Sequence, residues 1–309
     1  MDLKRARKEA CRVELQVERF LRERIGEAIE NTPKMFPDRA AVACQGIEGA
    51  YSQMACERMF SFPEIRFYKT FEEVFSAVEE GECRYGVLPV ENSTAGSVRQ
   101  VYDLMMTYRF YIVRSVRVKV DHCLLALPGT EKTCIREVVS HEQAIRQCAD
   151  YLKGLGDVRI AACENTAVAA RLVSKSGRSD LAALSSVRCA GLYGLSCLEE
   201  CVQDQGSNHT RFICISGDLE IYPGSDRSSI MVMASRAPWV LNKLLSCFDS
   251  FGTNLLKTEG CPLPEENYNC VYYFDVEKSA AEKNFSGMIG EISGLCERCE
   301  YLGSYMELT

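Results

Sequence analysis

Small polar residues gather at four places next to predicted helices. Gly46–Ser52, Glu91–Thr94 and Asn165–Thr166 each lie between a predicted strand and a predicted helix, and Ser140 precedes a predicted helix. In open α/β sheets ligands bind outside the carboxyl ends of the strands, and the first N–H groups of a helix attract anions. The sequence Ser140-His-Glu-Gln143 also matches a capping box, and capping would explain any one of these positions. A cleft that binds a carboxylate or phosphate and ordinary helix capping therefore both remain open.

A fifth polar cluster, Ser207-Asn-His-Thr-Arg-Phe212, begins an apolar strand. Arg211 could offer a two-pronged hydrogen bond to a carboxylate, and Thr210 would place a hydroxyl beside it. In the alternative interpretation Thr210 is only a strand-forming residue and Arg211 lies on the surface.

Several kinds of site lack their sequence signals. No Walker loop, no complete GxGxxG after a strand and no GxSxG elbow is present. The chain has 17 cysteines and 3 histidines, but its one CxxC, Cys296 to Cys299, has no second pair at zinc-ligand spacing. We expect the cysteines to be reduced and mostly buried, and we predict neither a metal site nor a cofactor. A net charge of −7 without a basic run argues against nucleic acid as a partner.

The composition is that of a folded globular protein. The 309 residues are 47% hydrophobic and 26% charged, which suggests about two domains. No apolar run approaches the roughly 20 residues that span a bilayer, so we expect no membrane segment. The charged N-terminal region does not resemble a secretory signal, and we expect a cytoplasmic location.

Hydrophobic periodicity predicts the elements that must position these residues. Residues 2–30 read as one amphipathic helix, and residues 40–216 alternate short strands with helices, which indicates an α/β fold with mainly parallel sheets. The expected strands are 41–44, 65–68, 85–90, 110–120, 122–127, 158–162, 180–184 and 210–216, and the helices include 51–60, 71–80, 98–108, 142–152 and 167–174. A linker at 217–227 precedes a βαββαβ order, which is typical of a ferredoxin-like module.

From Ala40 to Thr309 the chain resembles prephenate dehydratase with a C-terminal ACT domain. Six motifs in family order carry this resemblance: Gly46-Ile-Glu-Gly-Ala-Tyr-Ser52, Val87-Leu-Pro-Val-Glu-Asn-Ser93 with Gly96, Ser140-His-Glu-Gln-Ala144, Asn165-Thr-Ala167, Tyr193-Gly-Leu195 and Asn208-His-Thr-Arg-Phe212. The N-terminal helix is similar to the segment that joins chorismate mutase to dehydratase in bifunctional relatives. Only about 38 residues precede the dehydratase region, and we expect no mutase activity.

The resemblance implies a fold, an activity and a set of site residues. It implies two lobes like those of type II periplasmic binding proteins, with domains at 1–39, 40–217 and 228–309. It implies conversion of prephenate to phenylpyruvate in phenylalanine biosynthesis without a cofactor. Thr210 would be catalytic, and the residues around the substrate would be Ser52, Asn92, Ser93, Gly96, Asn165, Thr166, Ala167, Asn208, Arg211 and Phe212.

The region that corresponds to the family's phenylalanine site departs from the family pattern. The relevant positions are Trp239, Leu241, Glu259, Gly260 and Cys261. Trp239 stands where a glycine is usual, and the serine and arginine of a Glu-Ser-Arg-Pro motif are missing. We therefore predict weak or absent inhibition by L-phenylalanine, unless neighbouring loops rebuild the pocket.

Two other functions stay open. In arogenate dehydratase the side-chain keto group of the substrate is replaced by an amine, and the sequence does not separate the two substrates. A non-catalytic two-lobed sensor of small molecules is the alternative from another class. We expect a homodimer or homotetramer, because ACT domains commonly associate through their sheets.

Overall fold

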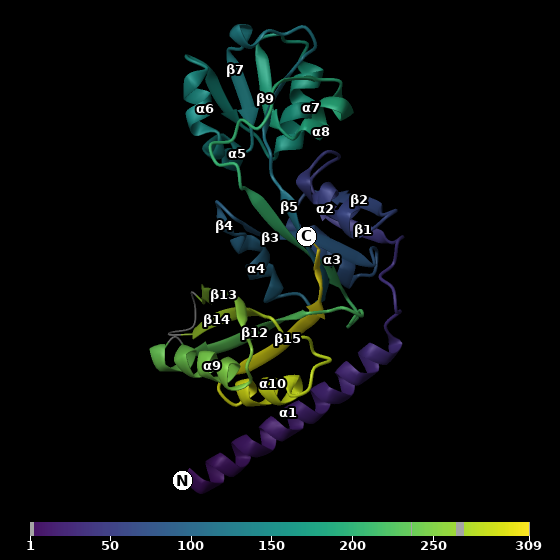
Figure 1. Cartoon of the computed structure of the whole chain (residues 1–309), viewed down its shortest axis with the longest axis vertical. Coiled ribbons are helices and arrows are strands. Elements are labelled where there is room, and N and C mark those ends of the chain that lie inside the picture. The colour runs from purple at the N-terminus through teal and green to yellow at the C-terminus, as the bar shows by residue number, and fades with distance from the viewer. Residues whose placement is uncertain (1–2, 236, 264–268, 309) are drawn as a thin grey trace. The chain divides into compact units, whose positions relative to one another are not determined.

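The computed structural model describes residues 3–235, 237–263 and 269–308, and its chain divides into two compact units (Figure 1). The first unit contains Met1–Pro37, Tyr102–Ser115 and Ile213–Leu308, and the second contains Asp38–Val101 and Val116–Phe212. Two strands, β5 (Tyr111–Lys119) and β11 (His209–Ser216), begin in one unit and end in the other.

The second unit contains a sheet in which β11, β3 (Tyr85–Asn92), β1 (Ala41–Gln45) and β2 (Glu64–Tyr68) follow one another. Strand β1 pairs in parallel with both β2 and β3, so the carboxyl ends of these strands meet at one edge. The short strand β4 (Gly96–Ser97) folds back on β3. The accompanying helices are α2 (Tyr51–Met59), α3 (Phe71–Glu79) and α4 (Arg99–Met105).

The same unit contains a five-stranded sheet with its own helices. Its order is β10 (Ser196–Glu199), β6 (Cys123–Ala126), β9 (Leu181–Ser185), β7 (Glu137–Ser140) and β8 (Arg159–Ala162). The helical elements are η1 (Lys132–Cys134), α5 (Glu142–Gln147), α6 (Ala149–Gly154), α7 (Thr166–Ser176) and α8 (Val187–Tyr193). Buried apolar residues cover both faces of this sheet.

Three expectations about this sheet and its helices are wrong. Only β8, β7 and β9 run parallel, whereas β6 and β10 are antiparallel to their neighbours. The strands β7 and β10 are absent from the expected strands. The predicted order of strands and helices is therefore incomplete in this sheet. The predicted helix 142–152 is two helices, because Cys148 lies between them with φ −117° and ψ 25°.

The first unit contains the predicted βαββαβ order. The elements are β12 (Arg227–Ser235), α9 (Pro238–Ser250), β13 (Leu255–Pro262), β14 (Asn269–Val276), α10 (Phe285–Ser293) and β15 (Arg298–Tyr305). The four strands are antiparallel in the order β13, β14, β12, β15, so the first and third strands of the module are central. The last strand, β16 (Glu307–Leu308), pairs with β5, and Ser115 N–H donates to the carbonyl of Met306 at 3.0 Å.

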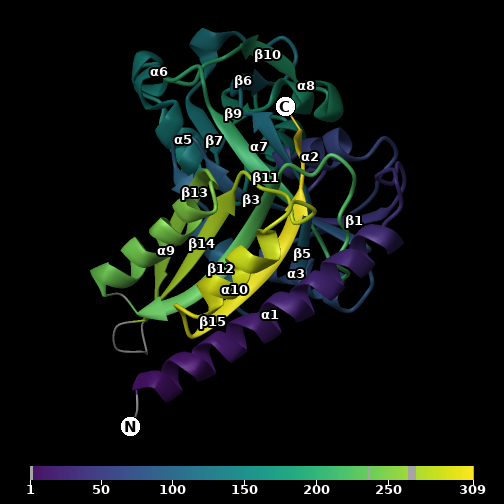
Figure 2. The same ribbon diagram turned by 60° about the horizontal axis from the view of Figure 1, so that its bottom comes forward.

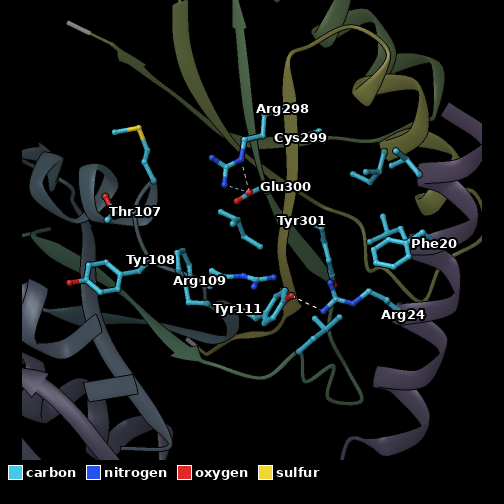
Figure 3. Close-up of a pocket in the computed structure, with 17 residues that line it drawn as sticks. Phe20, Arg24, Thr107, Tyr108, Arg109, Tyr111, Arg298, Cys299, Glu300 and Tyr301 are labelled. Carbon is cyan, nitrogen blue, oxygen red and sulfur yellow. Dashed lines mark hydrogen bonds and ion pairs between the residues drawn. The ribbon is translucent and has the colours of Figure 1, made fainter. Parts of the chain in front are cut away.

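The predicted N-terminal helix is α1 (Leu3–Asn31), which ends just before Pro33. Figures 1 and 2 both show it beside α10, and the two helices are in contact. Ile25 and Ala28 are buried in the core of this unit. Residues of α1 also form one wall of a cavity with β15 and the segment before β5 (Figure 3).

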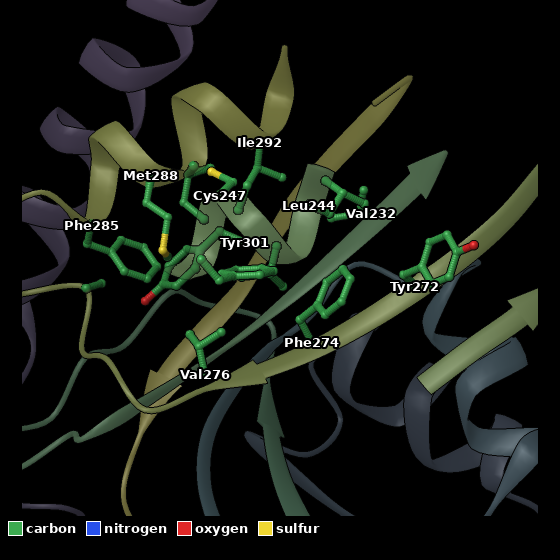
Figure 4. Close-up of a cluster of buried hydrophobic side chains, with 14 of the residues drawn as sticks. Val232, Leu244, Cys247, Tyr272, Phe274, Val276, Phe285, Met288, Ile292 and Tyr301 are labelled. Atoms are coloured by element: carbon green, nitrogen blue, oxygen red, sulfur yellow. The ribbon is translucent and has the colours of Figure 1, made fainter. Parts of the chain in front are cut away.

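The core of the first unit lies between the βαββαβ sheet and its helices (Figure 4). Phe248 and Phe274 have ring centroids 5.0 Å apart, and Phe285 meets Tyr301 edge to face at 5.4 Å. All of the described cysteines are free, and ten of them are buried, as small apolar side chains are in a packed interior. In the part of the chain that the structure covers, no helix has the length and apolar character that a bilayer span requires.

Candidate active site

A cavity of about 370 Å³ lies in the second unit, where the ends of β1, β3, β7 and β8 face the beginning of β11. Its lining comes from both sheets: Gln45, Ala50, Tyr51, Ser52, Phe71, Pro89, Asn92, Gln100, Val120, His122, His141, Gln143, Ala144, Gln147, Glu164, Asn165, Thr166 and Thr210. This is the location that the carboxyl-end rule predicts for a ligand.

Helices α2, α5 and α7 begin at this cavity, and α2 and α7 carry the residues that were selected from the sequence. The N-cap of α2 is Ala50, and buried Ser52 lies in its first turn. The N-cap of α7 is Asn165, whose side-chain oxygen accepts from Val168 N–H at 2.8 Å. The N–H groups of a first helical turn have no acceptor within the helix and carry partial positive charge, so both helix ends can hold an anion. None of the described lining residues is a lysine or arginine.

Asn92, at the end of β3, joins four residues of this region by hydrogen bonds. Its Nδ2 donates to Oγ1 of Thr210 at 2.9 Å and to Oδ1 of Asn208 at 2.7 Å. Its Oδ1 accepts from the backbone N–H groups of Thr94 at 3.1 Å and Ala95 at 3.0 Å. Asn92 is only 4% exposed. The turn after β3 and the start of β11 therefore depend on one buried amide.

Gln147, at the end of α5, extends this network. Its Nε2 donates to Oδ1 of Asn92 at 3.2 Å, and its Oε1 accepts from Nδ2 of Asn208 at 3.0 Å. Oε1 also lies 3.1 Å from Nε2 of His122. Since this oxygen can only accept, Nε2 of His122 carries the proton and donates.

These bonds share one direction. The donors run from His122 to Gln147, from Gln147 to Asn92, and from Asn92 to Thr210. The Thr210 oxygen is thus an acceptor within the protein, and its own hydrogen is available to a ligand in the cavity. Hydrogen bonds that point the same way polarise one another, which strengthens the last donor of the chain.

Burial controls the charge of two ring side chains at the cavity. His122 is 2% exposed, its Nδ1 has no hydrogen-bond partner among the described residues, and burial lowers its pKa. Burial raises the pKa of Tyr51 well above its usual value, and the Tyr51 hydroxyl donates to the carbonyl of Asp121 at 2.6 Å. Both side chains are therefore neutral near pH 7.

A second cavity, of about 610 Å³, shares Gln143 and Gln147 with the first. Its other lining residues are Ser93, Thr94, Ala95, Arg146, Gln203, Asp204, Gln205 and Asn208. Arg146 is exposed and makes no hydrogen bond or ion pair with any residue that the structure describes. It is a free cation next to the shared glutamines.

The structure gathers most of the residues selected from the sequence. Those that line the first cavity are Ser52, Asn92, Asn165, Thr166 and Thr210, and those that line the second are Ser93 and Asn208. Gly96, Ala167, Arg211 and Phe212 line neither cavity. Arg211 follows Thr210 on β11, and successive strand residues point to opposite faces. Arg211 is 6% exposed.

Sequence reasoning missed Tyr51, His122 and Gln147. Tyr51 is part of the motif Gly46–Ser52, and Gln147 follows the motif Ser140–Ala144 by three residues. Gln147 lies one helical turn after Gln143, and this spacing places both side chains on one face of α5. His122 belongs to none of the six motifs. Its contact with Gln147 joins positions 25 residues apart, and such a pairing has no local signal.

The residues selected for effector binding lie in the first unit. Trp239 is 59% exposed, and the ammonium group of Lys243 lies 4.8 Å from its ring centroid. Glu259 lies 4.0 Å from the Lys257 ammonium, and Cys261 is fully buried. The Trp239 ring therefore lies at the surface of this unit, and it does not fill a buried pocket.

A metal centre requires several donor side chains in one place. Among the residues with described positions, no group of three or more histidine, cysteine, aspartate or glutamate side chains is placed to hold a metal ion. The hydrogen-bonding groups of the cavity are amides, hydroxyls, helix ends and neutral rings, and its one ionisable carboxylate among the described lining residues is Glu164.

Comparison with known proteins shows which family the chain is similar to. An Arabidopsis thaliana protein, arogenate dehydratase/prephenate dehydratase 1, chloroplastic, is 37% identical over 284 residues, which cover 86% of this chain and 72% of that protein. The solved structure of GqqA, described as a novel type of quorum quenching acylase, superimposes with a TM-score of 0.77 at 29% identity over 86% of this chain and 97% of its own.

Prephenate dehydratase from Arthrobacter aurescens, solved in complex with L-Phe, has the same fold. The TM-score is 0.78 at 23% identity, with 86% of this chain and 89% of that chain covered. Residues 42–219 match the family model for prephenate dehydratase. The chain therefore belongs to the prephenate dehydratase family.

Proposed function

We propose that the chain converts prephenate to phenylpyruvate, water and carbon dioxide in the cavity next to Thr210. Members of this family are lyases, and the chain is an enzyme of that class. The observation that carries the proposal is the amide of Asn92, which holds the Thr210 oxygen at a cavity where α2 and α7 begin.

The reaction needs three things from the protein. The ring hydroxyl leaves with its bonding electrons and takes up a proton to become water. The electrons of the bond between the ring and its carboxylate form the aromatic ring, and that carboxylate departs as carbon dioxide. The site must therefore donate to the leaving hydroxyl, leave the ring carboxylate free to fragment, and hold the side-chain carboxylate.

Thr210 is suited to the first task as a hydrogen-bond donor. Its oxygen already accepts from Asn92, so its hydrogen points to the ligand side. A threonine hydroxyl is a weak acid, and we assign it as the donor that stabilises or relays to the leaving oxygen. Well-placed donors of this kind contribute about 10²- to 10³-fold to a rate.

Helix ends are suited to hold the side-chain carboxylate. The first turns of α2 and α7 both line the cavity, and its described lining contains no arginine or lysine. Arg211, which we expected to bind this carboxylate, is buried outside the lining. We therefore assign the carboxylate to the backbone N–H groups near Ser52 and Thr166. Ser93 and Asn208 then support Asn92 and the start of β11.

Apolar surroundings favour loss of the second carboxylate as a neutral gas, and Phe71, Pro89 and Val120 supply the apolar part of the lining. The neutral state of His122 and Tyr51 supports this, because neither adds a charge that would hold that carboxylate in place. The network that begins at His122 polarises Thr210 without transferring a proton through its two amides.

The test of this function is turnover by the purified chain. Phenylpyruvate should form from prephenate at a higher kcat/KM than phenylalanine forms from arogenate. Some related plant proteins carry both arogenate and prephenate dehydratase in their names, and others carry arogenate dehydratase alone. A higher kcat/KM for arogenate would show that arogenate is the substrate, and the same loss of water and carbon dioxide would then take place in the cavity. Inactivity on both substrates would favour the non-catalytic sensor.

Several further assignments belong to the same proposal. Residues 228–309 would be a regulatory ACT domain after a two-lobed dehydratase domain at 40–217, with residues 1–39 as a helical extension. The antiparallel βαββαβ arrangement supports the ACT assignment. A homodimer or homotetramer and a cytoplasmic location stay predictions, and L-phenylalanine would be at most a weak effector.

A further inference from the structure

A cavity of about 500 Å³ lies within the first unit, between α1, the segment Met106–Tyr111 and β15 (Figure 3). This volume is within the range of sites that bind small molecules. On α1 the lining positions 17, 20, 21 and 24 recur at steps of three and four residues, so they form one stripe of the helix. Neither the dehydratase chemistry nor the expected effector site uses these residues.

The charge of the lining is positive on a chain that is acidic. Arg24, Arg109 and Arg298 line the cavity together with one carboxylate, Glu300. That carboxylate is already paired with Arg298, whose Nε donates to it at 2.7 Å. Arg24 instead donates from Nη2 to the hydroxyl of Tyr111 at 2.9 Å.

Arg109 is the least satisfied of the three. It is exposed, and it makes no hydrogen bond or ion pair with any other residue whose position is described. Figure 3 shows the side chains of Arg24 and Arg109 pointing toward Tyr111 from two different elements. Two guanidinium groups without a carboxylate partner offer planar donor pairs that match a carboxylate.

Aromatic rings supply the rest of the wall. Phe20, Tyr108, Tyr111 and Tyr301 all line the cavity, and Phe20 is 61% exposed. The Arg24 guanidinium lies 5.8 Å from the ring centroids of both Phe20 and Tyr111. A ligand with one aromatic ring can pack against these rings while its anionic group meets the arginines. An ammonium group on the ligand would be repelled, because Glu300 is engaged.

We propose that this cavity binds a small aromatic carboxylate that carries no amine, with Arg109 and Arg24 on the carboxylate and Phe20 and Tyr111 on the ring. The site is distinct from the dehydratase cavity, because the two share no lining residue. The proposal does not rest on the proposed activity.

The experiment titrates phenylpyruvate, used as a probe of this chemistry, into the full chain by calorimetry. The matched variants are Arg109→Gln in the cavity and Arg171→Gln on α7, an exposed arginine that likewise has no described partner. A binding component should weaken about tenfold or more in Arg109→Gln and stay unchanged in Arg171→Gln. It should also weaken when salt is raised from about 0.05 to about 0.5 M.

Two further probes and one further variant sharpen the result. Pyruvate lacks the ring and L-phenylalanine adds an ammonium group, so neither should occupy this component. Phe20→Ala should weaken it several-fold without loss of folding, since that side chain is largely exposed. Prephenate turnover of Arg109→Gln should equal that of the parent. The inference would be overturned if Arg109→Gln bound phenylpyruvate as tightly as the parent does, or if pyruvate bound the parent as tightly as phenylpyruvate does. Either result would count whether or not the chain is a dehydratase.

Discussion

Nδ2 of Asn92 donates to Oγ1 of Thr210 at 2.9 Å, across 118 positions of sequence. Asn92 ends β3 and Thr210 lies near the start of β11, and these strands are neighbours in the sheet. The position of the proposed catalytic hydroxyl is thus set by a side chain of another strand. Changes to Asn92 should affect catalysis through Thr210.

Asn92→Ala should lower kcat for prephenate by about 10²-fold or more, because Thr210 loses its orienting donor. It should also lower the free energy of unfolding by about 1–3 kcal/mol, since Asn208 and the turn at Thr94 lose buried partners. Steady-state kinetics and urea unfolding measure the two effects. Asn242→Ala, on the exposed face of α9, is the control and should change neither quantity.

The buried His122 should make stability depend on pH. Its pKa is lowered by burial, so below its usual value near 6.5 the unfolded chain binds a proton that the folded chain does not. The contribution of His122 to the free energy of unfolding therefore falls as pH drops below about 6.5. Asp121 raises this pKa and His141 lowers it, and burial also lowers the pKa of His141.

His122→Gln should reduce the slope of unfolding free energy against pH between about 5 and 6.5. The slope that remains belongs to His141 and to other groups. The measurement is urea unfolding at a series of pH values, for the parent and the variant. An unchanged slope would mean that His122 is charged in the folded chain.

Gly49 has a backbone that only glycine adopts easily. Its φ is +92°, and an added Cβ would lie 2.8 Å from Sγ of Cys189 and 3.1 Å from Cδ2 of Leu192. Gly49→Ala should therefore cost roughly 2–5 kcal/mol of stability from strain and overpacking. Gly191→Ala is the matched control, because it lies within α8 with open space around its Cβ. The control should be neutral or slightly stabilising. Equal unfolding free energies for the two variants would contradict this reasoning.

The fold was largely predictable because its signals are local. The periodicity of residues 2–30 and the βαββαβ order after 228 depend on neighbours a few residues apart, and both are present. The strands β7 and β10 have four residues each, of which only two are apolar, whereas the equally short predicted strands β6 and β8 have four and three apolar residues. The site was predictable in part, because motifs identify residues but not the pairs they form. The side of β11 that Arg211 takes and the bond from His122 to Gln147 depend on tertiary packing.

L-phenylalanine should inhibit turnover weakly or not at all. The stretch Glu259-Gly-Cys-Pro262 lacks the serine and arginine expected of an effector site. The measurement is the rate of phenylpyruvate formation with added L-phenylalanine. A loss of activity at micromolar effector would show that other residues form the pocket.

The central claim is that Thr210 supplies the hydroxyl that acts on the departing oxygen of prephenate. The most direct test compares the initial rate of phenylpyruvate formation by the parent, Thr210→Val and Thr210→Ser. Valine keeps the shape but removes the hydroxyl, so the rate should fall by about 10²- to 10³-fold while prephenate still binds. Serine keeps the hydroxyl and should retain most of the rate. Parental turnover in Thr210→Val would contradict the account.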